Sequence, residues 1–423
     1  MSRLGRRIIA NGVTVSNNTY ETGLNNNDII IGKPGSGKTG GYISYNLANP
    51  NGSFVVSDTK GLLFKRFSKY LTKIGYKVRV LDFVRPERSC AYNPLKYIRR
   101  HSDGSFYEQD IKKVASVINP SLDKKEPFWD QAATRYICML IGYVLETSEG
   151  DDANMVAVVK AHQRFHLGEG ELEFKQYARM NPESFAARKY NELKSVSTAD
   201  RTWACIVEFA SVALDPFGYK DFEPIFGRAD DVDIASIGKE KTVIFLNCSD
   251  NDPSFHILSN IFNTQALQTL IEQADLNEEG KLDVPVRIIF DDFAAGPKIS
   301  ELDNMMSIIR SREISVSLIV QSITQLKTKY EENVCNTIIA NCDHIMYLAG
   351  NDIATAEYLA KHMNVPPKKI LDLPANKTIL ITAGEEPLIT DKLRPYSPEL
   401  MSKLEDVIKG KSDKGEKTMQ SIA

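Results

Sequence analysis

The stretch GKPGSGKT, residues 32–39, decides the fold of this 423-residue chain. It fits the pattern G-x-x-x-x-G-K-[ST] of a phosphate-binding loop. The β-branched run at residues 29–31 before it predicts a short buried strand, and a helix is expected over residues 38–47. Because the loop lies where a strand passes into a helix, the sequence favours a phosphate-binding loop over a chance glycine-rich turn.

The chemistry of this loop predicts a nucleoside triphosphate ligand. Its glycines let backbone N–H groups point inward, where they and the helix N-terminus can hold phosphate oxygens. Lys38 is expected to reach the β- and γ-phosphates, and the Thr39 hydroxyl to ligate Mg²⁺. The sequence therefore predicts ATP and Mg²⁺ as cofactors. The expected nucleotide contacts are Gly32, Pro34, Gly35, Ser36, Gly37, Lys38, Thr39 and Gly40.

A second carboxylate for the metal is expected from RIIFDD, residues 287–292. Three apolar residues predict a buried strand with Asp291 at its carboxyl end, where ligands bind in open α/β sheets. We expect Asp291 to hold Mg²⁺ through water, and Asp292 to orient or deprotonate the attacking water. The competing interpretation is an exposed Asp-Asp turn without a role in chemistry.

The order of the predicted elements indicates an α/β P-loop NTPase. Strand and helix patterns alternate over residues 29–82 and again over 242–348, which predicts a mainly parallel central sheet. In between, apolar residues recur at three- and four-residue spacing, which predicts an inserted all-α domain. The expected bounds are 1–102 and 236–408 for the nucleotide-binding domain, 103–235 for the insertion and 409–423 for a disordered tail.

Composition argues against a polybasic, a membrane-spanning, a secreted and a disulfide-stabilised protein. The net charge is −3, but residues 1–102 carry 17 basic and 5 acidic side chains, whereas 103–235 carry 15 and 23. The longest apolar runs, such as residues 137–145, are too short to span a bilayer, and no secretory signal is evident. The six cysteines lack CxxC spacing and are expected to be reduced. We therefore expect a cytoplasmic protein.

Two further positions follow from the strand expected near residues 315–320. Arg310 precedes this strand and Gln321 follows it. A strand-end glutamine can sense the γ-phosphate, and an arginine at a subunit edge can enter a neighbouring site as a finger. A surface salt bridge is the competing interpretation for the arginine.

Six motifs occur together in this chain: GKPGSGKT (32–39), SDTKG (57–61), YNPL (92–95), PFW (127–129), DDFA (291–294) and Arg310 with QS (321–322). Together they resemble the TraG/TraD-like coupling proteins of type IV secretion, over roughly residues 28–395. The resemblance implies a RecA-like domain with an all-α insertion, a homo-hexameric ring, Arg310 as an in-trans finger and Gln321 as a sensor. The implied partners are single-stranded or duplex DNA, relaxase or relaxosome proteins, effector proteins, and the channel ATPases and inner-membrane components of the secretion system.

The chain departs from this family pattern at two points. The usual Asp-Glu pair is Asp291-Asp292 here, one methylene shorter. Typical members have N-terminal transmembrane helices, whereas this sequence starts almost directly at the ATPase. Three alternatives are open: attachment at the inner face of the membrane through a partner, attachment through a segment that was removed, or no attachment. Two other functions stay open: a nucleotide-gated docking platform with weak hydrolysis, and a DNA-pumping ATPase outside secretion.

Weaker signals are the basic stripe and a histidine pair. Lys65, Lys69 and Lys73 share one face of an expected helix. This face could bind nucleic-acid phosphate or an anionic membrane surface, or it could simply be solvated. The acidic insertion is expected to meet basic protein surfaces and not DNA. His162 and His166 have zinc spacing but no third ligand, so a structural role is favoured.

Overall fold

The computed structural model describes residues 5–120, 127–196, 200–249, 255–296 and 298–410. Residues 411–423 of the expected disordered tail lie outside this range. The chain forms two compact units. The sheet unit comprises Met1–Val80, Asp233–Asn251 and Ala266–Ala423, and the helical unit comprises Leu81–Val232 and Asp252–Gln265. The domain bounds expected from the sequence stay a prediction.

A nine-stranded sheet is the centre of the sheet unit, with the order β11-β10-β9-β3-β8-β7-β4-β6-β5. The pairs that β3 makes with β8 and β9, and β4 with β6 and β7, are parallel, whereas β10 is antiparallel to β9 and β11. Its strands are β3 (Asp28–Ile31), β4 (Ser53–Ser57), β5 (Lys77–Asp82), β6 (Thr242–Asn247), β7 (Val286–Phe290), β8 (Ile314–Val320), β9 (His344–Tyr347), β10 (Lys377–Thr382) and β11 (Leu388–Asp391). The expected strands are confirmed, and β10 and β11 were not predicted.

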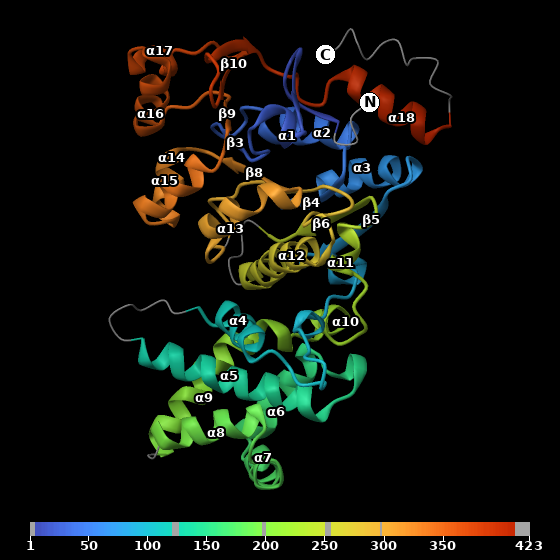
Figure 1. The fold of residues 1–423 in the computed structure, drawn as a ribbon, viewed down its shortest axis with the longest axis vertical. Coiled ribbons are helices and arrows are strands. Elements are labelled where there is room, and N and C mark those ends of the chain that lie inside the picture. The colour runs from blue at the N-terminus through green and yellow to red at the C-terminus, as the bar shows by residue number, and fades with distance from the viewer. Residues whose placement is uncertain (1–4, 121–126, 197–199, 250–254, 297, 411–423) are drawn as a thin grey trace. The chain divides into compact units, whose positions relative to one another are not determined.

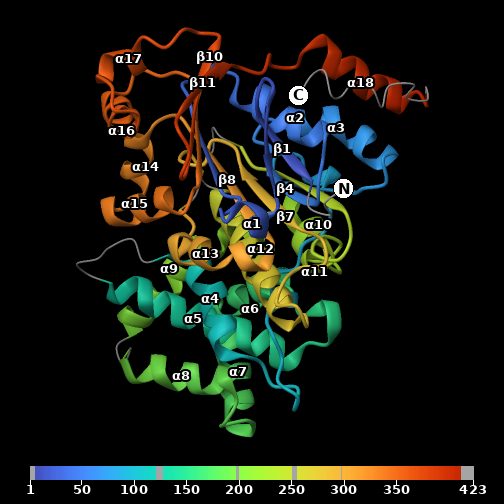
Figure 2. The same ribbon diagram turned by 45° about the horizontal axis from the view of Figure 1, so that its top comes forward.

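Two groups of helices accompany the sheet. Helices α2, α3 and α18 pack on one another (Figure 1), and α14 packs against α15 and α16 (Figure 2). A hairpin of β1 (Arg6–Ala10) and β2 (Val13–Ser16) completes the unit. The helices are α1 (Thr19–Thr22), a π-helical segment Lys38–Ile43, α2 (Ser44–Ala48), α3 (Leu62–Lys73), α11 (Ile234–Ile237), α13 (Leu302–Ile308), the 3-10 turn Arg310–Arg312, α14 (Ile323–Lys329), α15 (Glu332–Ala340), α16 (Ile353–Met363), α17 (Pro367–Leu371) and α18 (Pro398–Ile408).

Apolar residues fill both sides of the central strands. Ile30, Val56 and Ile289 belong to a core that also contains residues of α2, α3 and α18. Their neighbours in the same strands, such as Ile29 and Ile288, are also fully buried. Since successive side chains point to opposite faces of a strand, this continuous burial shows that both faces of the sheet are covered, as parallel sheets require.

A buried ion cluster joins the hairpin to the sheet. Arg7 donates to Asp28 with 2.8 Å between Nη2 and Oδ1, and Arg287 donates to Asp28 with 2.9 Å between Nη1 and Oδ2. The Tyr42 hydroxyl donates to the same carboxylate. Burial by itself raises the pKa of Asp28, but the guanidinium groups of Arg7 and Arg287 lower it to about 2. The carboxylate is therefore held in its charged form.

The helical unit is built around α5 (Phe128–Thr147), whose apolar residues are buried on most sides. α5 packs against α4, α6, α8 and α9. The expected helical character of this region is thus confirmed. The other elements are α4 (Glu108–Ile118), α6 (Met155–His166), α7 (Glu169–Met180), α8 (Phe185–Val196), α9 (Asp200–Gly218), α10 (Glu223–Phe226) and 3-10 turns at Pro86–Arg88, Pro94–Tyr97, Gly150–Asp152 and Lys220–Phe222; α12 (His256–Leu276) has residues in both units.

Candidate functional site

The glycine-rich loop is anchored at the carboxyl ends of three neighbouring strands. The loop follows β3 directly. Its Gly32 N–H donates at 3.1 Å to the carbonyl of Val320, the last residue of β8. The Lys33 N–H donates to the Ala349 carbonyl at 2.9 Å, just beyond β9. The loop then enters the helical segment Lys38–Ile43, whose first N–H groups have no carbonyl within the helix to bind. These donors suit an anion such as phosphate.

Gly37 is required both by its conformation and by a close neighbour. Its φ of 95° lies in the left-handed region, and a Cβ at this position would lie 2.8 Å from Cγ of Pro395. Gly40 is required by close neighbours alone, because a Cβ there would lie 2.8 Å from both Pro395 and Tyr396. The segment around Pro395 thus packs on the loop. It was missed in the sequence, where nothing marks it as a neighbour of residues more than 350 positions away.

Lys38 lies inside the loop. Its side chain is 8% exposed, and Nζ donates to the Gly32 carbonyl at 2.6 Å and to the Lys33 carbonyl at 3.3 Å. Burial lowers the pKa of Lys38, while the nearby Asp292 and Asp291 carboxylates oppose this shift. The ammonium is therefore placed where added phosphate oxygens would replace backbone carbonyls as its partners.

Thr39 and Asp291 meet although they are 252 positions apart in the chain. The Thr39 hydroxyl donates to Oδ2 of Asp291 at 2.7 Å. Burial raises the pKa of Asp291 to about 6, and the hydrogen bond from Thr39 opposes this rise. A hydroxyl and a carboxylate are oxygen ligands of the kind that Mg²⁺ takes beside substrate phosphates, so the pair fits this metal.

Asp292 and Gln321 complete the residues at this edge of the sheet. Asp292 has a left-handed φ of 48°, and its N–H donates to Oδ1 of Asp291 at 3.1 Å. Gln321 follows β8 directly, next to Val320, whose carbonyl binds the start of the loop. The structure therefore brings the expected residues Lys38, Thr39, Asp291, Asp292 and Gln321 to one edge, where sequence reasoning placed them.

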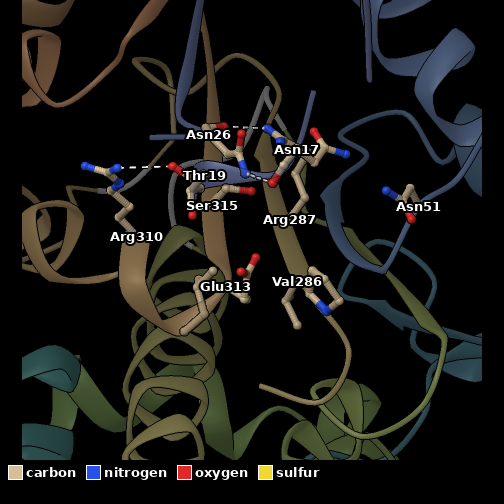
Figure 3. A pocket seen from close by; sticks show the side chains of 11 residues that line it. Asn17, Thr19, Asn26, Asn51, Val286, Arg287, Arg310, Glu313 and Ser315 are labelled. Atoms are coloured by element: carbon tan, nitrogen blue, oxygen red, sulfur yellow. Dashed lines mark hydrogen bonds between the residues drawn. The ribbon is translucent and has the colours of Figure 1, made fainter. Parts of the chain in front are cut away.

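Arg310 lies near the amino-terminal end of β8, whereas the residues above lie at the carboxyl ends of the strands. It precedes β8, and Nη2 donates to the Thr19 carbonyl at 3.2 Å, beside a pocket that Arg287, Glu313 and Ser315 also line (Figure 3). At about 3.3 Å per residue, the strand separates Arg310 from Gln321 by roughly 20 Å. Arg310 cannot reach the glycine-rich loop of its own chain. Arg312, by contrast, forms a salt bridge with Asp275 at 2.7 Å.

Among the weaker signals, the structure supports the structural interpretation of the histidines. His162 is buried, and its Nδ1 lies 3.2 Å from the Tyr136 hydroxyl. Within the described residues, no group of three or more His, Cys, Asp and Glu side chains is arranged to hold a metal ion. Lys65, Lys69 and Lys73 are exposed along α3. All six cysteines are free thiols.

Comparison with known proteins agrees with this arrangement. The family described as Type IV secretory system Conjugative DNA transfer matches residues 3–364. No curated protein matches the chain. No helix in the described part of the chain has the length and apolar character needed to cross a bilayer.

Solved structures of a bacterial conjugative coupling protein share the fold. The unbound monoclinic form of TrwBdeltaN70 is 14% identical over 93% of this chain and 91% of that one, with a TM-score of 0.67. TrwB in complex with the non-hydrolysable ATP analogue ADPNP is 15% identical over 88% and 87%, with a TM-score of 0.60. TrwB with ADP and Mg²⁺ is 13% identical over 88% and 87%, with a TM-score of 0.57. At these identities the likeness shows the fold, which confirms the expected RecA-like architecture.

Proposed function

The chain belongs to the type IV secretory system conjugative DNA transfer family, and on this premise we propose that it is an ATP-driven coupling protein. It hydrolyses ATP with Mg²⁺ and uses the energy to deliver cargo to a secretion channel. The observation that supports this most is the contact between Thr39 and Asp291 beside Lys38, because the lysine and both metal ligands of a P-loop site lie together. The TrwB complexes with ADPNP and with ADP and Mg²⁺ support the same ligands.

Each residue of the site has a distinct part in the proposed reaction. Lys38 turns its ammonium from the loop carbonyls to the β- and γ-phosphates, while the loop N–H groups hold the remaining oxygens. Thr39, and Asp291 through water, would hold Mg²⁺, and the bound ion would neutralise charge on the transferred phosphoryl group. Asp292 orients the attacking water and accepts its proton, and Gln321 binds near the γ-phosphate.

The proposed site is completed by a second copy of the chain. Arg310 lies at the far edge of its own sheet, so it can neutralise transition-state charge only in the site of a neighbour. We propose a homo-hexameric ring in which each subunit contributes its loop to one interface and its Arg310 to the next. Single-stranded or duplex DNA, relaxase or effector proteins and channel components are the proposed partners, at the cytoplasmic face of a membrane.

ATP turnover tests this proposal. Turnover is measured with and without single-stranded and duplex DNA, at several protein concentrations. We expect DNA to stimulate turnover, and turnover per subunit to rise steeply with concentration, because a neighbour completes the site. Turnover that is absent under all of these conditions, or that is independent of concentration, contradicts the proposed motor.

A nucleotide-gated docking platform is the second candidate, and the shorter Asp292 carboxylate favours it. In this case ATP sets assembly and hydrolysis is slow. The Asp292→Glu variant separates the two functions. A large gain in turnover relative to the wild type favours the platform, while loss or no change favours a motor adapted to aspartate.

A further inference from the structure

The backbone after Asp292 folds back on itself over residues 292–296. The Asp292 carbonyl accepts the N–H groups of Ala295 at 2.8 Å and Gly296 at 3.3 Å, and the Phe293 N–H donates to the Ile319 carbonyl at 2.8 Å. The hydrogen bonds just described therefore leave the carbonyls of Phe293, Ala294 and Gly296 to be bound by other donors. Since Asp292 itself has a left-handed φ of 48°, the turn needs other contacts to keep its conformation.

Lys329, the last residue of α14, supplies these contacts. Its Nζ donates to the Phe293 carbonyl at 2.8 Å and to the Ala294 carbonyl at 3.4 Å, and it also donates to the Gly296 carbonyl. An ammonium has three N–H donors, so this one side chain serves all three carbonyls. Burial lowers the pKa of Lys329 to about 7. The three carbonyl oxygens are the hydrogen-bond partners that a buried ammonium needs.

Aromatic contacts hold the same turn from a second side. The Lys329 ammonium lies 5.3 Å from the centroid of the Phe293 ring. Tyr330 stacks on this ring with centroids 5.8 Å apart, and the Tyr330 hydroxyl accepts the Ile299 N–H at 3.1 Å. Two consecutive residues therefore hold both the turn and the chain that follows it.

The helix that carries Lys329 begins next to Gln321. Ser322 caps α14 by accepting the Gln325 N–H at 3.1 Å, and seven residues later the helix ends at Lys329. A helix of this length spans roughly 10 Å. One short, rigid element thus joins the proposed γ-phosphate sensor to the turn that carries the proposed base.

We infer that Lys329 is a positioning residue for hydrolysis: its ammonium gathers three carbonyls of the turn after Asp292 and so fixes the carboxylate that activates water. The inference rests on the proposed function, because it concerns the acid assigned there. Without the ammonium, the carbonyls would bind water and the turn would gain freedom. A displacement of about 1 Å in a reacting group can lower a rate on the order of 100-fold.

The Lys329→Met variant tests this inference, because methionine keeps an apolar stem over Phe293 but removes the donors. We expect kcat for ATP to fall at least about tenfold, while KM changes less than about threefold, since Lys38, Thr39 and Asp291 are untouched. Lys327→Met is the matched control. Lys327 lies on the same helix and pairs with Glu332 at the surface, so kcat should stay within about twofold of the wild type.

A double-mutant cycle separates positioning from a general structural role. In the Asp292→Ala background, adding Lys329→Met should change kcat less than about twofold, because the positioned group is already absent. A merely structural lysine would lower kcat equally in both backgrounds and raise KM. Should Lys329→Met fail to fold, Lys329→Gln, which keeps an amide donor, is measured with the same expected direction.

The possible outcomes are distinct. An unchanged kcat in a folded Lys329→Met protein, or equal losses in the two backgrounds, overturns the inference and leaves the proposed function standing. Absence of turnover in the wild type overturns the proposed function and the inference together.

Discussion

Replacing Asp28 by asparagine tests whether the ion cluster at the start of β3 stabilises the sheet unit. Arg7 and Arg287 both contact this carboxylate, and all three side chains are at least 92% buried. The pKa of Asp28 falls from 3.8 to about 2 in the folded protein. At about 1.4 kcal/mol per tenfold change in proton affinity, folding favours the charged carboxylate by about 2–3 kcal/mol.

Asparagine removes the carboxylate that both buried guanidinium groups contact. Removing one partner of a buried pair costs about 3–5 kcal/mol, more than the pKa shift alone accounts for, because the desolvated partner remains. We therefore expect Asp28→Asn to lower the free energy of unfolding by about 3–5 kcal/mol at pH 7. The exposed pair of Lys77 and Glu240 is the control, and Lys77→Met should cost less than about 1 kcal/mol.

The assay must follow the sheet unit itself. Both tryptophans, Trp129 and Trp203, lie in the helical unit, so their fluorescence does not follow the cluster. Urea denaturation followed by far-UV circular dichroism, with amide hydrogen exchange in β1 and β3, measures the relevant stability. A loss below about 1 kcal/mol with unchanged exchange in β1 would refute the reasoning.

Acid adds an independent check with a definite sign. The folded pKa of Asp28 is depressed, so its contribution is fully present above pH 3.8 and is lost as the pH falls towards about 2. The difference in stability between the wild type and Asp28→Asn should therefore shrink across this window and be constant from pH 5 to 7. A difference that stays constant down to pH 2 contradicts the assignment of the charge to Asp28.

Three further predictions concern the candidate site. Lys38→Ala should abolish hydrolysis, because the γ-phosphate loses its main protein cation; retained turnover in the purified variant would remove Lys38 from the site. Mixing Lys38→Ala with Arg310→Ala should restore turnover that neither variant has alone, because a mixed interface contains one intact loop and one intact arginine; no recovery argues against a finger in trans. Gly37→Ala should weaken binding of a fluorescent ATP analogue far more than Gly35→Ala does. Both glycines have positive φ, but of these two only Gly37 would bring a Cβ against Pro395, whereas a Cβ at Gly35 would have no neighbour within 4 Å. Equal effects would show that backbone strain alone matters.

Much of the central sheet was predictable because its signals are local. A β-branched run before GKPGSGKT and the alternation of strand and helix patterns require no knowledge of distant contacts. β10 and β11 were missed because they are antiparallel strands added at one side of the sheet, outside the strand–helix alternation. In addition, β11 is largely exposed and lacks the continuous apolar run of a central strand. The buried partners of Asp28 were also unpredictable, since Arg7 and Arg287 lie 21 and 259 positions away.

The sequence by itself predicted the chemistry that we propose for the site. The loop pattern with Lys38 and Thr39 and the strand ending in Asp291 state which groups can hold phosphate and metal, because residue types and strand ends are local properties. Only the tertiary structure decided which groups act together. Pairing of β8 with β3 and β7 puts Gln321 at the nucleotide edge and Arg310 at the other, and the turn after Asp292 meets Lys329 only because α14 packs beside it. Such contacts depend on where strands and helices end in space, which no local pattern encodes.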